Sequence, residues 1–119
     1  LSERYKFKDS FGLSMGKNLF NDFIEEASLL PEDVDIIIKD LIKFIDSDKK
    51  GIHIDRYSDH IEGKLHEFRT NITNNRQIRI FYFKREDEII FLNGFLKKTQ
   101  KTPPRQIEAA KKILKELEW

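Results

Sequence analysis

Positively charged side chains gather in the second half of the sequence, where they could bind a phosphate group. Arg69 and Arg79 lie in two runs rich in β-branched and aromatic residues, and residues 97–102 read Lys-Lys-Thr-Gln-Lys-Thr. Arginine suits bidentate contacts with phosphate oxygens, and lysine adds a compact point charge. The basic segment also precedes an expected helix N-terminus, which favours anions. In combination these features predict an anion-binding site.

Arg79 is flanked in the sequence by Ile78, Ile80 and Phe81. An arginine in such an apolar strand loses hydration unless it is paired or faces a wet cleft. One interpretation is an ion pair with Glu67 or with an aspartate across neighbouring strands. The other is a cationic cleft that holds a phosphate. Both would satisfy the charge, so the sequence leaves both open.

Other kinds of site have little support in the sequence. The chain has no cysteine, which removes thiol chemistry and disulfides, and it lacks the glycine pattern of a phosphate-binding loop. His53, His60 and His66 lack the close spacing of a zinc site, so we expect neither a metal nor a cofactor. With an ordinary pKa, His66 would titrate near neutral pH and so suit acid–base work, but strand alternation puts it on the opposite face from Glu67.

Charge is unevenly distributed along the chain. Residues 1–63 carry a net charge of −5 and residues 64–119 one of +6, for a total of +1. A basic surface favours nucleic acid or an acidic protein as partner, although scattered lysine and arginine also simply solvate helices. The lack of cysteine is typical of a reducing compartment, and no apolar run approaches about 18 residues. We therefore expect a cytoplasmic protein with no membrane span.

The first half of the chain is expected to form a strand and two helices. Arg4–Lys8 alternates polar and aromatic residues, which predicts a short strand. Apolar residues recur at helical spacing over about residues 15–28, and again over residues 31–50, where Pro31 provides a typical helix start. Residues 51–63 show no period and are expected to be a polar connector.

The second half predicts three strands and a helix. Residues 64–72, 76–84 and 89–96 are the expected strands, and the short turns between them indicate an antiparallel meander. Thr102 can cap a last helix opened by Pro103. The 119-residue chain is thus expected to be a single α+β domain of order β-α-α-β-β-β-α. Its antiparallel sheet would pack against two N-terminal helices and a C-terminal helix.

Three segments resemble toxins of the RelE/ParE superfamily. Residues 64–69 (KLHEFR) resemble the Leu-x-Glu-Leu-Arg strand of these toxins, and residues 79–83 (RIFYF) resemble their Arg-Val/Ile-Phe-Tyr strand. Residues 93–103 (NGFLKKTQKTP) closely resemble the His-Gly-Phe-x-Lys-Lys-Thr-x-Lys-Thr-Pro signature of the HigB-like, phage-derived branch. Asn93 stands where that branch often has histidine. The resemblance is specific over residues 64–118 and is limited to the order of elements before them.

This resemblance implies a RelE-like fold and a toxin of a bacterial type II toxin–antitoxin system. The cognate antitoxin of the HigB branch carries a helix-turn-helix domain (HigA-like). Many such toxins cleave mRNA on the translating ribosome without metal, which implies a metal-independent endoribonuclease that inhibits translation. The alternatives are a ParE-like toxin that acts on DNA gyrase and an inactive relative that only binds its antitoxin. The cluster of cations favours the ribonuclease.

The resemblance also implies roles for individual side chains. Arg79 would stabilise the phosphate in the transition state, and Arg69 would do the same or bind an adjacent phosphate. Glu67 would orient the arginines or act as general base, with orientation the favoured role. One of Lys97 and Lys98 would approach the scissile phosphate. Contacts with flanking RNA would come from residues in or beside the basic segment, namely Lys101, Thr99 and Phe95, although core packing is the more common role of a phenylalanine.

Overall fold

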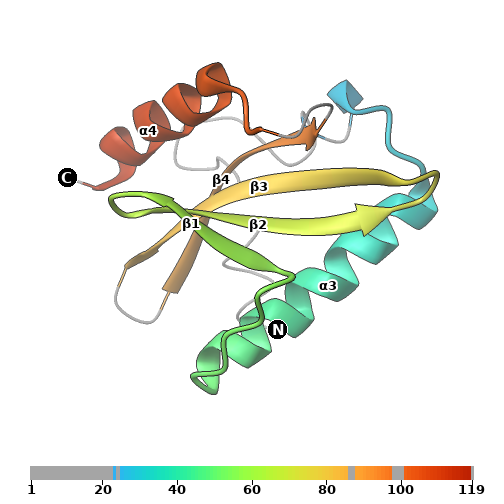
Figure 1. Ribbon diagram of the computed structural model, residues 1–119, viewed down its shortest axis with the longest axis horizontal. Helices are drawn as coiled ribbons and strands as arrows, with labels where there is room; N and C mark the ends of the chain where they lie inside the picture. The colour runs from blue at the N-terminus through green and yellow to red at the C-terminus, as the bar shows by residue number, and fades with distance from the viewer. Residues whose placement is uncertain (1–22, 24, 86–87, 98–100, 119) are drawn as a thin grey trace.

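The chain forms one antiparallel sheet flanked by helices in a computed structural model that describes residues 23, 25–85, 88–97 and 101–118. Sheet order is β1-β2-β3-β4, so each strand lies beside its neighbour in the chain (Figure 1). The elements, in chain order, are α3 (Pro31–Lys49), β1 (Ser58–Glu62), β2 (Leu65–Ile72), β3 (Arg76–Arg85), β4 (Glu88–Lys97) and α4 (Pro104–Glu118). No helix among these is long and apolar enough to cross a bilayer.

The α+β class, the helix from Pro31 and the meander of three strands are confirmed. The expectation of an irregular connector over residues 51–63 is wrong, because this segment contains β1. The described order therefore has four consecutive strands between α3 and α4, in place of the expected three. The predicted strand at Arg4–Lys8 lies outside the described residues. So does most of the helix predicted over residues 15–28, of which residues 23, 25 and 26 are helical.

Strand β1 forms because of its pairing with β2, not because of its own composition. Its sequence, Ser-Asp-His-Ile-Glu, has a single β-branched residue and no aromatic ring apart from the imidazole. It pairs antiparallel with β2, with Ser58 opposite Phe68 and His60 opposite His66. Gly63 makes the turn between the strands at φ +53°, a conformation that glycine adopts without steric cost.

The helices cover opposite faces of the sheet (Figure 1). On the α3 side, Ile37, Leu41 and Phe44 pack with Phe68, Ile78, Ile80 and Tyr82. On the α4 side, Leu65, Phe81, Phe83, Leu92 and Phe95 pack with Ala110. Successive side chains of β3 alternate between these two cores, so the run Ile78–Phe83 is buried throughout. Arg79, in the middle of that run, falls on the α4 side.

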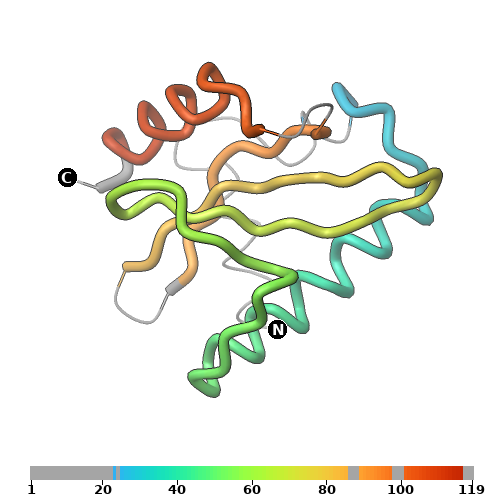
Figure 2. Tube along the Cα trace, in the orientation of Figure 1, coloured from blue at the N-terminus to red at the C-terminus, as the bar shows by residue number. Residues whose placement is uncertain are grey.

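Asp33 fastens the first turn of α3 to the hairpin between β2 and β3. Its buried carboxylate accepts hydrogen bonds from the Leu30 N–H (3.1 Å), the Thr73 hydroxyl (2.7 Å) and Arg76 Nη2 (2.6 Å). Burial alone would raise the pKa of Asp33, but these hydrogen bonds outweigh it and lower the pKa to about 2. Figure 2 shows the hairpin tip beside the start of the helix. The contact sets the position of β2 and β3 relative to α3.

We expect Asp33→Asn to lower the free energy of unfolding by about 2 kcal/mol, because Arg76 loses a charged partner in a buried contact. The folded-state pKa lies below the unfolded value of about 4, so the wild type keeps this contribution above about pH 4 and loses it toward pH 2. Urea unfolding across this pH range measures both effects. Asp35→Asn, at an exposed position two residues later, is the control. Equal losses in the two variants would contradict the assignment.

Candidate functional site

Strands β2, β3 and β4 bring most of the predicted site residues to one face of the sheet. The pairing puts Arg69 opposite Arg79, and Gln77 opposite Lys97. Glu67 precedes Arg69 by two residues and therefore shares its face. This is the face that α4 covers farther along the strands. Two predicted members of the site, Lys98 and Thr99, lie outside the described residues.

Arg79 and Glu67 form a buried ion pair at the centre of this face, between Arg79 Nη1 and Glu67 Oε1. The two residues are only 7% and 1% exposed. Gln77 Oε1 accepts a hydrogen bond from Arg79 Nε at 2.8 Å, and the Thr102 hydroxyl donates to Glu67 Oε2 at 3.4 Å. Burial lowers the pKa of Arg79, although the Asp59 carboxylate opposes this. The ion-pair interpretation is confirmed. Among the described residues, these two contacts of Arg79 use two of the five N–H donors of its guanidinium.

The Arg69 side chain is held by β1 and by the segment before β1. Its Nη2 donates to the Asp55 carbonyl at 2.7 Å and its Nε to the Arg56 carbonyl at 3.3 Å, while Nη1 lies 3.6 Å from the Asp59 carboxylate. Like charges directly opposite one another on two strands repel. These oxygens offset the repulsion from Arg79. Glu67 is therefore the partner of Arg79, and Arg69 depends on a different set of acceptors.

Lys97 ends β4 beside the two arginines and is partly buried. Partial burial lowers the pKa of Lys97 first, and the positive charges of Arg79 and Arg69 lower it further. An ammonium group with a depressed pKa releases its proton more readily, which suits acid–base chemistry. The site therefore places a fixed guanidinium beside an ammonium group whose pKa is lowered by partial burial and by the neighbouring charges.

The two remaining described candidates lie in different surroundings. Lys101 is exposed and directly precedes Thr102, the residue that contacts Glu67. Phe95 is 7% exposed and packs on Phe81 with 5.6 Å between ring centroids. Its ring belongs to the core on the α4 side, which leaves little surface on which a nucleobase could stack.

Sequence reasoning missed two members of the site. Gln77 lies two residues before Arg79 and therefore on the same face of β3. The alternation of side chains along the strand could have predicted this contact. Thr102 was expected to cap the last helix, but its hydroxyl donates to Glu67, and α4 begins only at Pro104. Thr102 lies 35 residues from Glu67 in the chain, and the two meet only once the sheet has formed. No local sequence pattern predicts such a contact.

Asn93, which stands where the resembling signature often has histidine, ties β4 to the first turn of α4. Its Nδ2 lies 3.4 Å from the Gln106 carbonyl and 3.3 Å from Gln106 Oε1. Its Oδ1 is buried and has no hydrogen-bond partner among the described residues. Asn93 thus holds the helix beside the site.

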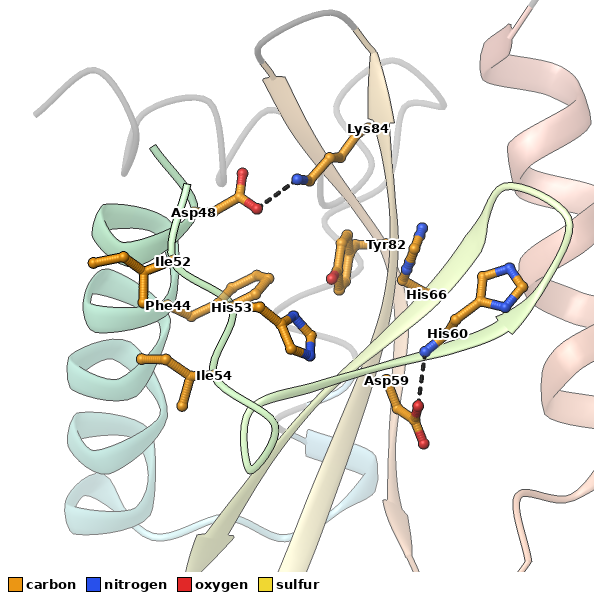
Figure 3. Close-up of a pocket in the computed structure, with 10 residues that line it drawn as sticks. All are labelled: Phe44, Asp48, Ile52, His53, Ile54, Asp59, His60, His66, Tyr82 and Lys84. Atoms are coloured by element: carbon orange, nitrogen blue, oxygen red, sulfur yellow. Dashed lines mark hydrogen bonds and ion pairs between the residues drawn. The ribbon is translucent and has the colours of Figure 1, made fainter. Parts of the chain in front are cut away.

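A hollow of about 300 Å³ lies on the α3 side of the sheet (Figure 3). His66 stacks on Tyr82 there with 5.2 Å between ring centroids, and it meets His60 edge-on at 5.1 Å. Burial lowers the pKa of His66, as do the charges of His60 and Lys84. His66 thus faces away from Glu67, as strand alternation predicts. No group of three histidine or acidic residues in the described part of the chain could hold a metal ion.

A family model described as phage derived protein Gp49-like (DUF891) matches residues 28–115. The chain belongs to this Gp49-like family. The family is part of the RelE/toxin-like superfamily. The match includes α3, all four strands and every side chain of the site described above. No curated protein matches the sequence.

We expect Arg69→Gln to raise the pKa of Lys97 in this Gp49-like protein, because the Arg69 guanidinium is one of the charges that disfavour the ammonium form. An NMR titration of the protein carrying ¹³C-dimethylated lysines measures the change. Lys112, exposed on α4, is the internal control. A Lys97 pKa that stays constant or falls in this variant would show that the cations are not coupled.

Proposed function

We propose that this Gp49-like protein is the toxin of a type II toxin–antitoxin system and cleaves mRNA on the translating ribosome without a metal. The observation that carries the proposal is the group of three adjacent cations, Arg69, Arg79 and Lys97, on one face of the sheet. Membership of the RelE/toxin-like superfamily supports the same conclusion. We propose that a cognate antitoxin with a helix-turn-helix domain neutralises it.

The proposed reaction is a transfer of the phosphoryl group within the RNA chain. The 2′-oxygen attacks the adjacent phosphorus, its proton passes to a base, and the bond from phosphorus to the 5′-oxygen breaks as that oxygen takes up a proton. The products are a 2′,3′-cyclic phosphate and a 5′-hydroxyl. Extra negative charge develops on the non-bridging oxygens in the transition state, so fixed positive charges accelerate the reaction.

Each side chain of the site has a distinct role in this scheme. Arg79 is already fixed by Glu67 and Gln77, so the N–H donors that these two contacts do not use meet the developing charge without reorganisation. Lys97, with its lowered pKa, donates a proton to the leaving 5′-oxygen. Arg69 binds the same or the next phosphate. Glu67 is a positioning residue because it acts through Arg79.

We expect the double variant Arg79→Met, Glu67→Gln to lose mRNA cleavage by about 100-fold or more, the scale seen when a charge-stabilising donor is removed. Changing both residues avoids leaving a buried carboxylate unpaired, which would threaten folding. The measurement is induced expression in a bacterium, with growth followed alongside mapping of mRNA 5′ ends.

Lys112→Ala, at an exposed position on α4, is the control and should arrest growth like the wild type. Circular dichroism of the purified proteins verifies that each variant is folded. A folded double variant that still cuts messages would overturn the site. Growth arrest by the wild type with intact messages would overturn the ribonuclease and favour an action on DNA gyrase.

A further inference from the structure

A polar hollow of about 250 Å³ borders the site at the open edge of β2. It exists because β1 covers only part of that edge. The pairing of β1 with β2 ends at Ser58 and Phe68, and the last link is the Arg69 N–H, which donates to the Tyr57 carbonyl at 2.9 Å. Beyond Arg69, two side chains flank the edge of β2. These are Lys43 from α3 and Arg56 from the segment before β1.

The hollow and the site are joined through shared side chains. Gln77 accepts a hydrogen bond from Arg79 through Oε1, and its Nε2 donates to Asn71 Oδ1 at 2.9 Å. Asn71 lines the hollow, as does Arg69, whose charge also acts on Lys97. The chain of hydrogen bonds from Arg79 through Gln77 to Asn71 therefore connects the site with the hollow.

Positive charge in the hollow exceeds negative charge. Lys43, Arg56 and Arg69 contribute three cations, and Asp40 is the one carboxylate among the lining residues. The Asp59 carboxylate, outside the lining, lies 3.6 Å from Arg69 Nη1, so the cations still outnumber the carboxylates. Hydroxyl groups take up both oxygens of Asp40: the Tyr57 hydroxyl donates to Oδ1 at 3.3 Å and that of Thr70 to Oδ2. Among the described residues, the carboxylate is thus held by two neutral donors. The charge balance favours an anionic ligand such as a phosphate.

The same hollow presents a flat group and an amide. Arg56 lies over the Tyr57 ring, with 4.8 Å between its Cζ and the ring centroid, and Nη2 donates to the Tyr57 hydroxyl at 3.1 Å. Arg56 is exposed, and guanidinium planes are platforms on which unpaired RNA bases stack. Gln77 donates to Asn71 Oδ1, and the exposed side chain of Asn71 also carries an Nδ2 group, a donor suited to a base edge.

We propose that this hollow binds the nucleotide next to the scissile phosphate and sets a base preference at that position. Lys43 and Arg69 hold its phosphate, Arg56 stacks on its base, and Asn71 donates to the base edge. The inference rests on the proposed ribonuclease function. It adds specificity to that function from residues on α3 and on the segment before β1, which take no part in the cleavage step.

The test is to map the 5′ ends of messages in cells that express each variant, and to compare both the number of cuts and the bases beside them. We expect Arg56→Ala to remove the base preference at the nucleotide next to the cut. Cutting at the sites that carry the preferred base should fall by roughly tenfold, the scale of one lost stacking contact. Arg56→Lys keeps the charge but not the plane, so it should lose the same preference with a smaller drop in cutting. Lys43→Ala should reduce cutting at all sites alike, because a phosphate contact carries no sequence information.

Lys112→Ala is the matched control for removal of an exposed lysine, and it should cut as the wild type does. If the wild type cuts messages and the variants at Lys43 and Arg56 give the same cuts at the same frequency, the subsite is refuted while the ribonuclease stands. That outcome would leave an acidic protein segment as the candidate occupant of the hollow. If the wild type produces no new ends, both the function and the subsite are refuted.

Discussion

The ion pair between Arg79 and Glu67 is the constraint on which the rest of the site depends. Both groups are buried, and β3 supplies apolar neighbours on either side of Arg79. A slip of one residue in the pairing of β2 and β3 would turn Arg79 into the core on the α3 side, away from Glu67. The pair therefore specifies the alignment of the two strands, and it fixes the direction in which the guanidinium points.

Such a pair is weak support for stability, since the cost of removing two charges from water often exceeds their attraction. The neighbouring charges add to that cost, because Arg69 lies directly opposite Arg79 and Lys97 is near enough to be affected by both. Three apolar side chains in place of Arg69, Arg79 and Lys97 would pack here without the cost of removing charges from water. The concentration of positive charge is better explained by a ligand that carries negative charge, and a phosphate of RNA has the right chemistry.

Much of the sheet and part of the site could be predicted from local patterns. The β-branched and aromatic run around Arg79 predicts β3, and strand alternation alone puts Glu67 on the same face as Arg69. What the sequence could not predict depends on contacts between distant segments. Strand β1 is polar and forms only against β2, and the acceptors of Arg69 come from that segment. The contact of Thr102 with Glu67 likewise arises only once the sheet has formed.

The most direct test of the central claim is the chemistry of the cut ends. Purified protein would be mixed with translating ribosomes in the presence of a chelator of divalent ions that leaves enough Mg²⁺ to keep the ribosomes intact, and the 3′ ends of the fragments would be identified. Attack by the 2′-oxygen predicts a 2′,3′-cyclic phosphate or the 3′-phosphate formed from it, together with a 5′-hydroxyl. Fragments that end in a 3′-hydroxyl, or messages that remain uncut, would contradict the account.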